Sequence, residues 1–119
     1  MARFLISGSR GTDDPTLATL PFIAAKTAKD QGHDVVLWLW SEAVTLGRKG
    51  TADHVVGVNL TPLKDLLAAV QAARIPLWVC GACAVARQMQ ATDLVAGAAI
   101  KGMPDYIQAA AERDKVITF

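Results

Sequence analysis

The stretch Ile75-Pro76-Leu77-Trp78-Val79-Cys80-Gly81-Ala82-Cys83 decides the fold of this chain. Its first five residues form a short apolar run, which is typical of a buried strand, and the residues after it are expected to open a helix. Cys80 is therefore expected at the carboxyl edge of a sheet, beside the free N–H groups of a helix N-terminus. A helix N-terminus or a CxxC motif lowers the pKa of a cysteine from about 8.5 to between about 3.5 and 7.5, so this position favours a thiolate.

Strands and helices alternate along the rest of the chain. The segment 50–60 is expected to be a loop, with a short strand at 55–58 as the alternative. This alternation predicts a parallel sheet with helices on both faces and right-handed crossovers, and 119 residues predict a single domain spanning 1–119. Ser41 and Thr61 are expected to cap the helices that follow them. The expected strands are 4–7, 34–40, 77–79, 96–100 and 116–119, and the expected helices are 16–31, 41–48, 62–70, 84–90 and 104–112.

Composition narrows the classes of partner. Hydrophobic residues make up 52% of the chain, an excess that predicts burial between subunits and hence a homo-oligomer. With 12 basic and 11 acidic residues and no run of like charge, no nucleic-acid partner is expected. No stretch is long enough for a signal-peptide core or a membrane span, so the expected location is the cytoplasm. Two cysteines three positions apart are a poor structural staple, which favours a reactive or metal-binding role.

Other loops are expected at the same edge as Cys80, because the carboxyl ends of parallel strands meet there and ligands collect outside them. The loop Gly8, Ser9, Arg10 and Gly11 follows the first strand and could cradle an anion with its backbone N–H groups, although it lacks a complete phosphate-binding fingerprint. Ser41 and Glu42 follow the second strand. Arg87 lies four residues after Cys83 and could face either the site or solvent. Gly8, Ser9, Arg10, Gly11, Ser41 and Arg87 are the candidate site-lining residues.

Several segments together resemble the DsrE/DsrF-like family of small sulfur-relay proteins. They are 79–87 (VCGACAVAR), 100–105 (IKGMPD), the ending 114–119 (DKVITF), and the early stretches 20–22 and 32–35. The resemblance covers nearly the whole chain. It implies a three-layer α/β/α fold of the DsrE and flavodoxin-like type, with a parallel sheet of about five strands, assembled into trimers or hexamers.

The resemblance also implies a function. Cys80 matches the sulfur-accepting cysteine of the family, so the chain is expected to accept persulfide sulfur from a donor protein and pass it to an acceptor protein, without a cofactor. Thiolate attack on a sulfur–sulfur bond follows the rules of disulfide exchange. For Cys83 two roles stay open: it resolves the persulfide by forming a disulfide with Cys80, or it only packs against the helix.

Other functions compete with sulfur relay. The first is a non-catalytic member of the same fold that is structural or binds a small ligand, such as a nucleotide or coenzyme A, at the Gly8 loop. The second is a CxxC dithiol oxidoreductase, although the motif lies later in the chain than in thioredoxin-like proteins. No metal site is expected, because zinc needs three or four protein ligands and only His33 and His54 could add to the two cysteines.

Overall fold

A computed structural model describes residues 1–119. Each expected strand is present close to its predicted bounds: β1 (Arg3–Gly8), β2 (Asp34–Leu39), β3 (Leu77–Cys80), β4 (Ala98–Lys101) and β5 (Lys115–Thr118). The α-helices are α1 (Pro15–Asp30), α2 (Leu63–Ala72), α3 (Gly81–Ala86) and α4 (Met103–Glu112). Three short 3-10 helices complete the chain: η1 (Ser41–Gly47), η2 (Thr51–His54) and η3 (Ala91–Asp93). The segment 50–60 is not a strand, as expected, although η2 lies within it.

The five strands form one parallel sheet in the order β4-β3-β2-β1-β5. Gly8 of β1 pairs with Leu39 of β2, and Cys80 of β3 pairs with Lys101 of β4, so these strands end at one edge of the sheet. The chain adds β2, β3 and β4 on one side of β1 and then returns to place β5 on the other side. The topological switch point is therefore beside β1, and Cys80 lies two strands away from it.

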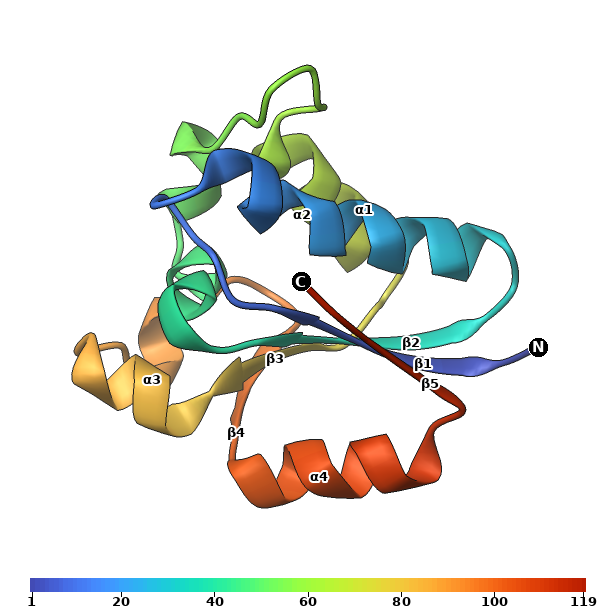
Figure 1. Cartoon of the computed structure of the whole chain (residues 1–119). Coiled ribbons are helices and arrows are strands. Elements are labelled where there is room, and N and C mark those ends of the chain that lie inside the picture. The colour runs from blue at the N-terminus through green and yellow to red at the C-terminus, as the bar shows by residue number, and fades with distance from the viewer.

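Helices cover both faces of the sheet, which makes the three-layer α/β/α fold that the sequence predicts (Figure 1). Helices α1 and α2 lie on one face, where Phe22 and Leu67 pack with Leu37 of β2. Helix α4 lies on the other face, where Tyr106 packs with Trp38 of β2. Alternate residues of the inner strand β2 thus pack into two separate cores, one on each face of the sheet. This explains why the strand is apolar on both faces. No helix of the protein has both the length and the apolar character needed to cross a bilayer.

Two helix starts differ from the expectation. Ser41 does not cap η1, because it adopts a left-handed backbone conformation with φ 53° and makes no side-chain cap bond. Thr61 does not cap α2 either, because Pro62 occupies the N-cap position. The amide of Leu63, which a cap would have satisfied, instead donates to the carbonyl of Val55 at 3.0 Å. A left-handed turn at Ser41 and a tertiary hydrogen bond at Leu63 thus replace the side-chain caps that the local sequence predicts.

Helix α3 is also shorter than the predicted 84–90. It begins directly after Cys80 and ends at Ala86, because Gln88 takes a left-handed conformation with φ 56°. The amide of Met89 then donates back to the carbonyl of Ala84 at 2.9 Å, which closes the helix as a Schellman motif does. The second cysteine therefore stands in the first turn of a six-residue helix.

Candidate functional site

Cys80 is the last residue of β3 and the N-cap residue of α3, as the sequence predicts. Its side chain points to the α4 face of the sheet, where it belongs to an apolar cluster that includes Trp38 and Tyr106. Only 6% of Cys80 is exposed, and it is not in a disulfide. The residue that the family resemblance favours as sulfur acceptor is thus a free but largely covered thiol.

Cys83 lies in the first turn of α3 and is the more exposed of the two cysteines. Its Sγ accepts a hydrogen bond from the backbone N–H of Ser41 at 3.1 Å. The left-handed conformation of Ser41 accompanies this contact, and it is one that residues other than glycine rarely adopt. The structure therefore brings the predicted residue Ser41 to the cysteine pair, through its backbone and not its hydroxyl.

The surroundings raise the pKa of the Cys83 thiol above its ordinary value. Burial is the largest cause, because it disfavours the charged thiolate, and the hydrogen bond from Ser41 works in the opposite direction. The Cys80 thiol raises the pKa further through a hydrogen bond and through its charge, whereas the positive charge of Arg87 lowers it. The thiolate-favouring environment expected of a CxxC motif thus does not extend to Cys83, which stays protonated at neutral pH.

Arg87 turns back toward the cysteines. Its Nη2 and Nε atoms donate to Oε2 of Glu42 at 3.0 and 3.3 Å, and its Nη1 donates to the carbonyl of Cys83 at 3.1 Å. Arg48 in turn donates to the carbonyl of Arg87 at 3.3 Å. Because Glu42 belongs to η1, these bonds fasten the end of α3 to the segment that carries Ser41. Of the two orientations open from the sequence, Arg87 adopts the one that faces the site.

An aromatic layer covers the α4 side of the site. The ring of Tyr106 lies 5.0 Å from that of Trp38 and 4.7 Å from that of Trp40, measured between centroids. The Tyr106 hydroxyl is 3.1 Å from the Ser7 hydroxyl in a buried hydrogen bond. The Trp38 indole N–H has no hydrogen-bond partner, and that ring meets Trp40 and Trp78 edge-on. Tyr106 was missed from the sequence, because its position depends on the crossover that places α4 under β1 and β2.

Several polar groups of the loop after β1 make hydrogen bonds within the protein. The backbone N–H of Gly11 donates to Oδ1 of Asp13 at 2.7 Å, and the Arg10 guanidinium pairs with Oδ2 of the same carboxylate at 3.2 Å. The Ser9 hydroxyl donates to the backbone carbonyl of Phe119 at 2.8 Å. The Gly11 bond is the largest cause that lowers the pKa of Asp13. The Gly11 amide, the Ser9 hydroxyl and the Arg10 guanidinium are therefore engaged within the protein.

The same loop nevertheless contacts the site through close packing. A Cβ atom on Gly11 would lie 2.6 Å from the carbonyl oxygen of Glu42 and 2.9 Å from Oγ1 of Thr45, both in η1. A Cβ on Gly8 would lie 2.8 Å from Cγ of Pro21 in α1. These glycines are required by steric contact, and Gly11 in particular seats the loop against the segment that holds Ser41.

No group of three or more histidine, cysteine, aspartate or glutamate side chains is placed to hold a metal ion. His33, one of the two histidines that could have joined the cysteines, accepts a hydrogen bond on Nδ1 from the amide of Ala2 at 2.9 Å. It lies at the amino end of β2, beside the start of β1.

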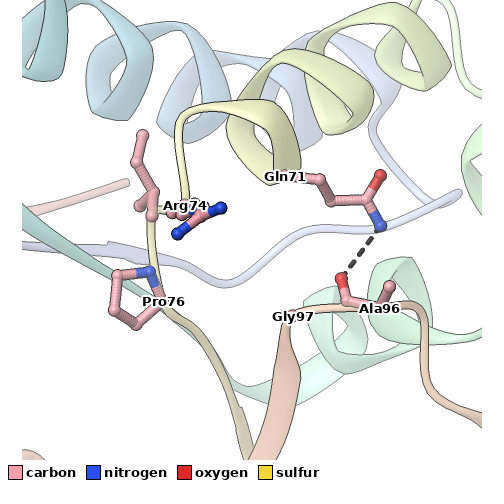
Figure 2. Close-up of a pocket in the computed structure, with 6 residues that line it drawn as sticks. Gln71, Arg74, Pro76, Ala96 and Gly97 are labelled. Atoms are coloured by element: carbon pink, nitrogen blue, oxygen red, sulfur yellow. Dashed lines mark hydrogen bonds between the residues drawn. The ribbon is translucent and has the colours of Figure 1, made fainter.

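A hollow of ≈ 370 Å³ lies elsewhere, at the amino ends of β3 and β4 (Figure 2). Arg74, Pro76 and Gly97 line it, and the Gln71 amide donates across its rim to the carbonyl of Ala96 at 2.9 Å. Since Cys80 lies at the opposite end of β3, this hollow is separate from the thiol site. The cysteines, Ser41, Glu42 and Arg87 form the candidate functional site.

Comparisons with known proteins agree with this picture. Among solved structures, the YchN protein from E. coli is similar over 100% of both chains, with a TM-score of 0.85 and 24% sequence identity. A protein of unknown function, MTH1491 from Methanobacterium thermoautotrophicum, also covers 100% of both chains, with a TM-score of 0.75 and 14% identity. At these identities the likeness establishes the fold. No curated protein matches the chain. The model of the DsrE/DsrF-like family matches residues 2–119, and the chain therefore belongs to the DsrE/DsrF-like family.

Proposed function

We propose that this protein is a sulfur-relay protein that accepts a persulfide sulfur on Cys80 and passes it to a thiol of a partner protein. The observation that carries the proposal is the free Cys80 thiol at the carboxyl end of β3, with a second thiol in the next helical turn, in a chain of the DsrE/DsrF-like family. Relay through free thiols suits a reducing compartment, such as the cytoplasm, where disulfides do not persist.

The transfer consists of two sulfur exchanges. The Cys80 thiolate attacks the outer sulfur of a donor persulfide, R–S–SH, and forms Cys80–S–SH while the donor leaves as R–S⁻. The acceptor thiolate then attacks the same outer sulfur and regenerates the Cys80 thiolate. Atoms and electrons balance in both steps, because one sulfur–sulfur bond breaks as another forms. No cofactor is required.

The burial of Cys80 sets a condition on the donor. With 6% of the residue exposed, a bulky persulfide reaches Sγ only if the first turn of α3 moves aside, whereas a small donor needs less space.

The other residues predicted to line the site divide into two groups. Ser41 and Arg87 contact Cys83 directly. The loop residues Gly8, Ser9, Arg10 and Gly11 contact Asp13, α1, η1 and the C-terminus instead.

The test is sulfur loading followed by intact mass spectrometry. Reduced protein is incubated with glutathione persulfide, freed of excess donor and weighed, in parallel with Cys80→Ser and Cys83→Ser. We expect a gain of one sulfur atom in the wild type and in Cys83→Ser, and none in Cys80→Ser. Equal gain in Cys80→Ser, or no gain in any folded variant, would contradict the proposal. Circular dichroism confirms that each variant is folded.

The assembly predicted from composition belongs to the same proposal. All four residues of β5 are exposed at one edge of the sheet, and further apolar side chains are exposed on α3, β4 and α4. Such surface suits contacts between copies of the chain. We propose a trimer or hexamer, and light scattering that gives the 12.6 kDa mass of one chain at micromolar concentration would contradict it. The exposed apolar side chains are Val85, Ile100, Met103, Ile107, Val116 and Ile117.

A further inference from the structure

We propose that Cys83 gives the protein a second activity, in which it converts the Cys80 persulfide into an internal Cys80–Cys83 disulfide and releases hydrosulfide. This inference rests on the proposed loading of Cys80 and concerns what ends the loaded state. It assigns Cys83 a chemical role in place of a packing role. The protein would then be both a carrier of sulfur and a slow source of sulfide.

The positions of the two cysteines allow this reaction. Cys80 is the N-cap residue of α3 and Cys83 is the third residue of that helix. The side chain of an N-cap residue lies beside the second and third residues of its helix, and a disulfide needs Cβ atoms about 3.5–4.5 Å apart, so a shift of the first turn brings the two sulfurs into bonding range. Cys80 belongs to the apolar cluster on the α4 face, and Cys83 packs against the same cluster, so the two side chains lie in one region of the protein. Neither is engaged in a disulfide.

The chemistry balances without an added oxidant. The Cys83 thiolate attacks the inner sulfur of Cys80–S–SH, which is the Sγ atom of Cys80 itself. A Cys80–Cys83 bond forms, the bond to the outer sulfur breaks, and that sulfur leaves as HS⁻. The persulfide is the oxidant, because its outer sulfur departs with the bonding electron pair. Each loaded chain yields one hydrosulfide and one internal disulfide.

The Ser41 amide gives Cys83 a donor that a packing cysteine does not need. This N–H lies 3.1 Å from Sγ and comes from a residue held in the left-handed conformation. A hydrogen bond of this kind stabilises the thiolate as it forms for attack, since a charged acceptor binds an N–H more strongly than a neutral one. The arrangement suits a thiol that loses its proton only as it attacks the persulfide.

Charged and titratable groups surround Cys83 from several elements, and together they keep the reaction slow at neutral pH. Cys80 of β3 raises the pKa of Cys83, Arg87 at the end of α3 lowers it, and Glu42 of η1 neutralises part of the Arg87 charge. On the far side of Cys80, Lys101 of β4 holds its amine 5.4 Å from the Trp78 ring centroid. Burial is the largest cause of the raised pKa of Cys83, and it lowers the thiolate fraction that can attack the persulfide. Raising the pH increases the thiolate fraction and speeds the release.

The experiment follows the loaded protein over time. Wild type and Cys83→Ser are loaded with glutathione persulfide, freed of donor, and held at about pH 7 and about pH 9, on either side of the ordinary cysteine pKa. Released sulfide and intact mass are recorded together. We expect the wild type to lose its extra sulfur, to end two hydrogens below the reduced mass, and to do so faster at the higher pH. Cys83→Ser should keep its sulfur at least about tenfold longer, which is the factor that 1.4 kcal/mol of barrier provides.

Two controls keep the outcomes distinct. Cys83→Ala repeats the test with a residue that suits a helix, in case serine disturbs α3, and Arg74→Gln changes a cation at the opposite edge of the sheet and should behave like the wild type. If no variant gains sulfur, loading at Cys80 fails and this inference fails with it. If Cys83→Ser and Cys83→Ala load but lose sulfur as fast as the wild type, only the role of Cys83 is overturned. Wild type that ends as the dithiol without a disulfide also overturns it.

Discussion

Two segments at the carboxyl edge of the sheet, Gly8–Gly11 at the end of β1 and Cys80–Cys83 at the end of β3, are both candidates for function in the sequence but differ in the structure. The Gly8–Gly11 loop lies at the topological switch point, where ligands of such folds usually bind. Its Gly11 amide and Arg10 guanidinium are nevertheless engaged by Asp13, and its Ser9 hydroxyl by the carbonyl of Phe119. Cys80 lies two strands away, yet it and Cys83 are the groups that remain chemically free. Position at the switch point is therefore less informative than which donors and nucleophiles lack an internal partner.

The two segments are also connected. Gly11 packs against the carbonyl of Glu42, the Glu42 carboxylate binds Arg87, and Arg87 donates to the carbonyl of Cys83. Ser41, the residue before Glu42 in η1, donates its backbone N–H to Sγ of Cys83. The comparison thus assigns the β1 loop a supporting role: it holds η1 in place, and η1 positions the partners of the dithiol.

The largest expected effect comes from Gly11→Ala. The new methyl group would stand 2.6 Å from a backbone oxygen that cannot rotate away, so η1 must shift. We expect the free energy of unfolding to fall by about 2 kcal/mol, within the range for overpacked sites, as measured by urea denaturation. Ser9→Ala is the matched control in the same loop, because it removes one hydrogen bond without a clash and should cost about 1 kcal/mol. Equal stability of Gly11→Ala and wild type would show that the loop does not support η1.

The next effect concerns the two thiols. Iodoacetamide alkylates the thiolate, and the folded protein raises the pKa of Cys83. The pH at which alkylation of Cys83 becomes fast should therefore be higher in the folded protein than in the unfolded chain. In Cys80→Ser the profile should move back toward lower pH, since the Cys80 thiol contributes to the rise. The raised pKa also means that the folded state holds its proton longer, so this residue contributes a loss of stability as the pH rises above the pKa of the unfolded thiol. A profile that does not change on unfolding would contradict the assignment.

Arg87→Gln tests the link that Arg87 forms between Glu42 of η1 and Cys83. The variant loses the ion pair with Glu42, whose side chains are 30% and 39% exposed, and we expect a cost of about 0.5–1 kcal/mol because solvent screens the pair. The Arg87 charge also lowers the pKa of Cys83, so its removal should move the alkylation profile of Cys83 to higher pH. Arg87→Lys keeps the charge but not the fork of donors, and it should lose stability with a smaller change in the profile. A shift to lower pH in Arg87→Gln would be inconsistent with this geometry.

An effect of opposite sign, a gain in stability, is expected outside both segments. Arg74 follows α2 with φ 56°, a conformation in which a side chain is strained and glycine is not. Arg74→Gly should therefore raise the free energy of unfolding by up to about 1 kcal/mol in urea denaturation. Sulfur loading should not change, because the residue lies at the amino edge of the sheet. A change in loading would mean that the two edges are coupled, which no contact described above provides.

Much of the architecture could be predicted from local pattern. The apolar runs located all five strands, and the alternation with amphipathic segments gave the parallel α/β arrangement, because these features depend on the chemistry of neighbouring residues. The position of Cys80 at a strand end followed in the same way. The predicted helix caps at Ser41 and Thr61 were wrong. Ser41 adopts a left-handed backbone conformation, and the Leu63 amide, which Thr61 was expected to cap, donates to the carbonyl of Val55. Local propensity does not report such long-range competitors.

The site itself could be predicted only in part. The sequence indicated the dithiol and the neighbouring loops, but not the strand order that separates Cys80 from the switch point. It left Arg87 between two orientations, and the early end of α3 at Ala86 is what lets that side chain reach Glu42. It also placed a possible cradle at Gly11, where the steric fit against η1 explains the glycine. Each of these depends on tertiary packing.

The central claim is that the relayed sulfur is carried by Cys80, and its most direct test is to locate that sulfur. Protein loaded with glutathione persulfide is alkylated with iodoacetamide, which caps the persulfide before Cys83 can attack it, and is then digested with trypsin. Cleavage after Arg74 and Arg87 releases residues 75–87 with both cysteines, and fragment ions that break between Gly81 and Ala82 distinguish them. The account predicts the extra sulfur on Cys80. Extra sulfur on Cys83, with Cys80 alkylated as an ordinary thiol, would contradict it.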